Sequence, residues 1–254
     1  MNAIRKISFI GLLACVAIGC NGENAPDCFQ NAGELVTEEI SVPAFDKITV
    51  FENIQLILKQ GPVQEVVIET GEFLVDEVIA EVIGDRLVLR NTNNCNLFRE
   101  YGITKLYVTS PNIMEVRSST GLPILSDGVL GFPEISLISE SFNDPEAETT
   151  DGSFELVVAS QTIKIVANGI AFFQLSGTAE NFTTTIAAGD SRVEAQELIV
   201  QNVVVNHRGS NDILVNPQQI LRGVIRGTGN VVSFNRPDSV DVEVLYRGEL
   251  IFKD

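Results

Sequence analysis

The sequence predicts an all-β protein folded as a right-handed β-helix, that is, a solenoid-like stack of parallel strands. Two observations exclude a helical protein: apolar and polar residues alternate at period two in short runs, and helical periodicity is almost absent. A third observation favours the stack, because glycine-containing turns recur at a nearly constant spacing from about residue 150 onward. A β-sandwich with evenly spaced hairpins is the alternative.

The predicted strands of the first half are short and rich in Val, Ile and Leu. They cover residues 54–59, 66–69, 86–90 and 105–109. Gly84-Asp85 separates two alternating runs and predicts a tight turn. Residues 74–82 alone are compatible with a short helix.

The turns of the second half recur at intervals of 20, 20 and 18 residues. They are Asn168-Gly169, Ala188-Gly189, Arg208-Gly209 and Arg226-Gly227. Glycine and asparagine suit such corners because the chain must adopt backbone angles that other residues disfavour. A single turn cannot bury its inward side chains alone, so stacked turns form a continuous core. The alternating residues 240–252 predict a final strand or cap at the end of the stack.

Composition excludes several classes of protein. The 254 residues carry a formal net charge of −17, so nucleic acid is not a predicted partner. A hydrophobic content of 44% is too high for a disordered chain. The sequence contains one histidine, which leaves little material for a metal centre, and no cofactor is expected.

The first 19 residues predict a bacterial lipoprotein signal peptide. A short basic segment is followed by 13 apolar residues, which are too few for a permanent transmembrane helix. Cys20 follows small residues and is the predicted lipidation site, which anchors the protein in the cell envelope. Cys15 is a rival position, and an ordinary cleaved signal with unmodified Cys20 is the alternative.

The predicted mature chain has a tether and N-terminal arm over residues 20–44 and one domain over residues 45–254. Thiols oxidise outside the cytoplasm, and loss of Cys15 with lipidation of Cys20 leaves two cysteines. We therefore predict a disulfide between Cys28 and Cys95.

Several segments resemble the putative auto-transporter adhesin head GIN domain family over roughly residues 45–234. They are Phe45–Gly61, Leu106–Ile113, Leu175–Gly177, Gly209–Ile213 and Gly227–Val231. The resemblance implies an exported β-helical domain, often a lipoprotein, without an established catalytic activity. It carries over no functional residue. Residues 118–121 depart from the Ser-Gly pattern expected of the family, and Phe142–Asp151 resembles an inserted loop.

Two features of the sequence are candidates for metal or catalytic sites. His207, the only histidine, is interpreted as a packed or solvated turn residue rather than a catalytic group. Four acidic residues lie within one stretch of eight: Asp144, Glu146, Glu148 and Asp151. Their spacing matches no known Ca²⁺ loop. A solvated loop is the preferred interpretation, and whether it binds a cation stays open.

The arginines of the last 50 residues suggest an anion-binding edge. If Gly209 and Gly227 occupy equivalent corners, Arg208 and Arg226 stack on one edge and are able to bind a carboxylate, sulfate or acidic sugar. Residues 152–254 carry 8 basic and 11 acidic side chains, whereas residues 20–151 carry 7 and 23. Ion pairs with neighbouring acids are the alternative role for the arginines.

These observations predict a non-catalytic envelope lipoprotein, an adhesin-like or scaffold module that contacts a surface glycan or protein. A glycan-binding or glycan-cleaving β-helix is the runner-up. Cleavage requires clustered acids, and the only close pair in the repeats, Glu194 and Glu197, is predicted to lie on opposite faces of a strand. The sequence does not indicate the ligand, the membrane face or the oligomeric state.

Overall fold

The computed structural model describes residues 28, 30–93, 95–96, 101–143, 147 and 149–253. The predicted signal peptide, Cys15 and Cys20 lie outside these residues. Asp144, Glu146 and Glu148 of the acidic loop also lie outside them.

The described residues form 17 strands, and the only helix with defined bounds among them is one 3₁₀ turn. The strands of the first half are β1 (Leu35–Glu39), β2 (Lys47–Val50), β3 (Gln55–Gln60), β4 (Glu65–Gly71), β5 (Val78–Ile83), β6 (Arg86–Asn91), β7 (Lys105–Ser110), β8 (Glu115–Ser118), β9 (Pro123–Leu130) and β10 (Glu134–Ser139). The remaining strands are β11 (Ser153–Ala167), β12 (Phe172–Ile186), β13 (Arg192–His207), β14 (Ile213–Ile225), β15 (Val231–Ser233), β16 (Ser239–Val244) and β17 (Leu250–Phe252). The 3₁₀ turn, η2 (Val75–Glu77), is the only helical part of residues 74–82, because residues 78–82 belong to β5.

Alternation of side chains explains why these segments form strands. In β3, Leu56 and Leu58 are fully buried, whereas Ile57 between them is only half-buried and Lys59 is exposed. Successive side chains of a strand point to opposite faces, so each strand contributes one face to a shared core. Inside that core, the rings of Phe154 and Phe173 stack with centroids 4.9 Å apart.

The strands form one curled sheet, in which neighbouring strands pair in two separate rows. One row runs β1–β4–β7–β3–β9, and the other runs β5–β6–β2–β8–β10. Both rows meet at β11, which pairs with β9 through its first half and with β10 through its second. β12, β13 and β14 continue both rows, which end at β17 and β16.

The all-β prediction is confirmed, but a stack made only of parallel strands is too narrow a description. β4 pairs antiparallel with β1 and β7, and β5 pairs antiparallel with β6 through the predicted turn at Gly84-Asp85. The sheet is therefore mixed. The turn at Gly84-Asp85 folds β6 back on β5, and the short loop after β3 reverses the chain, so β4 runs against β7, the parallel neighbour of β3. A period-two pattern permits parallel and antiparallel pairing equally well.

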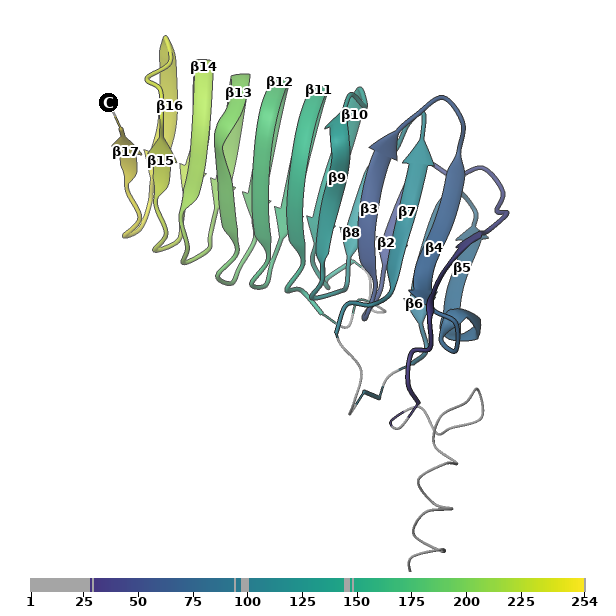
Figure 1. Ribbon diagram of the computed structural model, residues 1–254. Helices are drawn as coiled ribbons and strands as arrows, with labels where there is room; N and C mark the ends of the chain where they lie inside the picture. Colours follow the sequence, from purple (N-terminus) through teal and green to yellow (C-terminus); the bar gives the residue numbers. More distant parts are fainter. Residues whose placement is uncertain are drawn as a thin grey trace, which may run out of the picture.

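The two ends of the sheet lie far apart. β1, which belongs to the N-terminal arm, and β5 form its edges at one end, and β16 and β17 form its edges at the other (Figure 1). β16 and β17 thus continue the sheet as its last strands. Among the described residues, no helix is both long and apolar enough to cross a membrane.

Candidate binding site

The structure places Arg208 and Arg226 side by side in neighbouring turns. The backbone N–H of Arg226 donates to the His207 carbonyl, and that of Arg208 donates to the Ile186 carbonyl. His207 pairs with Ile225, so the two arginines follow equivalent positions of adjacent strands, about 4.8 Å apart in the backbone. Both side chains are exposed, and neither forms an ion pair within the described part of the chain.

The glycines that follow the arginines explain this alignment. A Cβ atom built on Gly227 would lie 2.0 Å from the carbonyl oxygen of Gly209, so the two backbones approach too closely for any side chain. A Cβ atom on Gly189 would likewise lie 2.2 Å from the carbonyl oxygen of Gly169. The prediction that Gly209 and Gly227 occupy equivalent corners is confirmed.

Side-chain hydrogen bonds make these corners rigid. Asp212 Oδ1 accepts from both the backbone N–H and the side-chain Nδ2 of Asn230, each at 3.0 Å. Asn230 Oδ1 in turn accepts from the backbone N–H of Glu249 at 3.0 Å. Each polar side chain therefore links its own turn to the next one, which holds the arginine edge in a fixed geometry.

His207 lies beneath this edge and is fully buried. Burial lowers the pKa of His207 because removal from water disfavours the charged imidazolium. Its Nδ1 accepts a hydrogen bond from the backbone N–H of Gly209 at 3.4 Å. The packed-turn interpretation is confirmed, and a neutral His207 adds no positive charge to the arginine edge.

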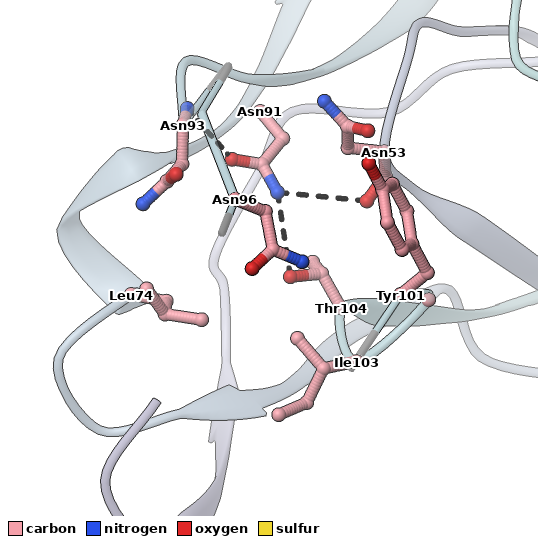
Figure 2. Close-up of a pocket in the computed structure, with 9 residues that line it drawn as sticks. Asn53, Leu74, Asn91, Asn93, Asn96, Tyr101, Ile103 and Thr104 are labelled. Atoms are coloured by element: carbon pink, nitrogen blue, oxygen red, sulfur yellow. Dashed lines mark hydrogen bonds between the residues drawn. The ribbon is translucent and has the colours of Figure 1, made fainter. Parts of the chain in front are cut away.

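A second polar region, not identified from the sequence, lies beside the N-terminal arm (Figure 2). It is a pocket of about 40 Å³ lined by Asn53, Leu74, Asn91, Asn93, Asn96, Tyr101, Gly102, Ile103 and Thr104. Asn91 Nδ2 donates to Thr104 Oγ1 at 3.3 Å and to the Asn53 carbonyl at 3.5 Å. The pocket has room for a water molecule or one small polar group, but not for a ring.

The predicted disulfide lies next to this pocket. Cys28 and Cys95 are bonded, with their Cα atoms 4.5 Å apart and a sequence separation of 67. The bond ties the N-terminal arm to the asparagine-rich segment that lines the pocket. Asn93 Nδ2 also donates to Gln30 Oε1 at 3.4 Å, which reinforces the same connection. The asparagines of the run Asn93-Asn94-Cys95-Asn96 are the sequence signal that could have located this polar region.

The other candidate groups are not assembled into a site. Among the described residues, no three His, Cys, Asp or Glu side chains are placed to hold a metal ion. Only Asp151 of the four loop acids is among the described residues, so the solvated loop stays a prediction. Glu194 accepts a hydrogen bond from Arg192 Nε at 2.7 Å, and Glu197 is exposed.

Comparison with known proteins gives a family match and a set of similar folds. The model of the family described as "Putative auto-transporter adhesin, head GIN domain" matches residues 44–237. No curated protein matches the sequence.

Three solved structures share the fold at low sequence identity. A putative adhesin from Bacteroides fragilis NCTC 9343 has a TM-score of 0.75 at 17% identity, with 88% of this chain and 99% of that chain covered. A putative lipid binding protein from Parabacteroides distasonis ATCC 8503 gives 0.62 at 16% identity, covering 87% and 98%. A putative adhesin from Parabacteroides merdae ATCC 43184 gives 0.60 at 17% identity, covering 87% and 97%.

Proposed function

Because the chain belongs to the family described as "Putative auto-transporter adhesin, head GIN domain", we propose that it is a non-catalytic, adhesin-like module of the bacterial cell envelope. Two of the three solved structures above are described as putative adhesins and the third as a putative lipid binding protein, which supports a binding role over a chemical one. A lipid on Cys20 would anchor the module to the membrane.

The Cys28–Cys95 disulfide is the observation that best supports a location outside the cytoplasm. Disulfides form in oxidising compartments and are rare in the cytosol, so the bond supports export. It also joins the arm that follows Cys20 to the sheet, so a lipid at Cys20 would hold the β1 end close to the membrane. The arginine edge belongs to the opposite half of the sheet (Figure 1).

The arginine edge is our proposed contact for an anionic partner. Arg208 and Arg226 are adjacent, exposed and free of ion pairs within the described residues, so both guanidinium groups are available to a carboxylate or sulfate. This half of the chain carries a small net charge, whereas residues 20–151 carry a large negative one. An acidic surface glycan or protein therefore meets the least repulsion at this edge.

The late strands support the finer β-helical description that the sequence predicts. β11, β12, β13 and β14 are parallel neighbours, and each pairs along most of its length. We propose that they follow a right-handed helical path. Cysteine pairs introduced at the aligned positions Thr183 and Val204 are expected to cross-link within one chain, and failure to do so contradicts that register.

Two experiments test the proposed function. Radiolabelled palmitate is expected to label the wild-type chain and not the Cys20→Ser variant; an unlabelled wild type contradicts lipid anchoring. Protease treatment of intact cells then reports which membrane face carries the domain.

Binding to sulfated and carboxylated glycans on an array tests the arginine edge. The double variant Arg208→Ala, Arg226→Ala is expected to lose that binding, with Arg222→Ala as the control for an exposed arginine on a strand outside the pair. Unchanged binding by the double variant contradicts the proposed contact.

A further inference from the structure

The outer face of the N-terminal half carries a row of half-buried apolar side chains. Leu125 of β9, Ile57 of β3, Tyr107 of β7 and Val67 of β4 are aligned in register across four neighbouring strands. Both chain neighbours of Ile57, Tyr107 and Val67 are buried in the core, as is the residue before Leu125, so alternation directs these four side chains outward. The row forms an apolar floor with one aromatic ring at its centre.

A cleft of about 480 Å³ lies on this floor. Ile57, Val67 and Tyr107 line it, together with the turn at Gly61-Pro62. Gln60 stiffens that turn, because its Oε1 accepts from the backbone N–H of Gly131 at 2.7 Å. The cleft therefore has a preformed shape, and its volume is in the range of sites that hold small ring-shaped ligands.

Charged groups stand at the mouth of the cleft. Lys59 Nζ lies 2.8 Å from Asp127 Oδ2, and the two side chains are 56% and 57% exposed. An ion pair this open contributes little to stability, so both groups are available for hydrogen bonds to a ligand. Glu65 adds a further acid to the rim. Lys59 supplies donors and Asp127 supplies acceptors, the combination that a hydroxyl group can satisfy in both directions.

We propose that this cleft binds a ring of a neutral glycan, with the apolar C–H face of the sugar on Tyr107 and its hydroxyl groups hydrogen-bonded to Lys59 and Asp127. This inference deepens the proposed function. It rests on one part of it, namely that the domain is a binding module. It adds a ligand class and a second, chemically different site to the arginine edge.

Charge and backbone pairing distinguish a neutral sugar from other ligands. The cleft carries two acids against one lysine, and residues 20–151 are strongly acidic, so an anionic glycan is repelled. β9, β3, β7 and β4 are each paired on both sides, so no open strand edge is offered to a peptide backbone. An acyl chain would displace water from the ion pair and offer no hydrogen bonds in its place, which disfavours a lipid tail as the ligand.

An array of neutral, sialylated and sulfated oligosaccharides, probed with the full-length protein in detergent, tests the proposal. A neutral oligosaccharide is expected to bind, and titration calorimetry then measures its affinity for the variants. Tyr107→Ala is expected to weaken binding at least about tenfold, whereas Tyr107→Phe keeps the ring and the affinity. Tyr246→Ala, which alters a tyrosine 57% exposed outside the cleft, is the matched control and leaves binding unchanged.

A second variant keeps the test valid if Tyr107→Ala does not fold. Asp127→Asn changes an exposed side chain and is also expected to weaken binding. The proposal is overturned if no neutral oligosaccharide binds, or if Tyr107→Ala and Asp127→Asn both bind as the wild type does. Binding of sulfated or sialylated glycans alone, lost in the Arg208→Ala, Arg226→Ala variant, overturns it as well while supporting the proposed function.

Discussion

The Arg117 guanidinium lies 3.0 Å from Oε1 of Glu140, and both side chains are more than nine-tenths buried. The same Arg117 nitrogen donates to the backbone carbonyl of Glu140 at 3.0 Å. Glu140 Oε2 accepts from the backbone N–H groups of Phe142 and Asn143. This buried pair therefore fixes the start of the acidic loop against β8, although the sequence suggested only a solvated insertion.

Removal of one partner from this pair is expected to destabilise the protein strongly. Arg117→Met leaves the Glu140 carboxylate buried without its counter-charge, which costs about 3–5 kcal/mol of unfolding free energy. Urea denaturation measures the loss. The exposed pair Lys164–Glu134 is the matched control, and Lys164→Met is expected to cost about 0–1 kcal/mol. Equal losses in the two variants would contradict the importance of burial.

Stability is expected to fall in acid in two steps, which belong to two different groups. Burial holds the pKa of His207 below its ordinary value of 6.5, so the unfolded chain binds a proton there first and stability decreases as pH falls below 6.5. For Glu140, burial alone would raise the pKa, but hydrogen bonds from Arg117 and two backbone N–H groups lower it below its ordinary value of 4.5. The stabilisation from Glu140 is present above pH 4.5 and is lost as pH falls through its folded-state pKa.

Urea midpoints measured across this pH range test both steps. The His207→Leu variant is expected to lose the decrease between pH 6.5 and 4.5 while keeping the one below 4.5. A variant with the full wild-type decrease in the upper range would show that another group is responsible.

The disulfide is expected to contribute up to about 4 kcal/mol, because it closes a loop of 67 residues in the unfolded chain. The double variant Cys28→Ser, Cys95→Ser should lower the denaturation midpoint by the same amount as reduction of the wild type with dithiothreitol. The reductant should leave the double variant unchanged. A wild type that is insensitive to the reductant would contradict a stabilising bond.

The glycine corners are expected to be intolerant of any side chain. Gly227→Ala places a Cβ atom 2.0 Å from the Gly209 carbonyl oxygen, so the turns must separate and the unfolding temperature falls. Gly84→Asn is the control: its φ of +69° suits asparagine, and no atom lies within 4 Å of the added Cβ. A wild-type unfolding temperature for Gly227→Ala would mean that the corners are loosely packed.

Much of the structure of residues 150–254 was predictable, because the positions of its turns depend on residues close together in the sequence. Each corner needs a glycine at a position where two backbones meet, and the spacing of Gly209 and Gly227 reports that requirement directly. The same spacing led to the adjacency of Arg208 and Arg226. The Cys28–Cys95 pairing followed from the number of cysteines left after the signal segment.

The cleft and the buried ion pair were not predictable in this way. Tyr107 and Ile57 are 50 positions apart, and nothing in either segment indicates that β3 and β7 become neighbours. Arg117 and Glu140 are 23 positions apart, and neither segment carries a sequence signal of burial, so their pairing is settled only when β8 packs against the end of β10.

The sequence by itself determined that this protein is an all-β member of its family, with stacked glycine corners and one disulfide, because period-two alternation, turn chemistry and cysteine number are local properties. Only the tertiary structure decided that β1, β4 and β5 pair in antiparallel fashion, and that Tyr107, Ile57 and Lys59 share a cleft with Asp127. Alternation specifies which face of a strand is buried; the partner, direction and register of that strand are settled only when the whole core packs.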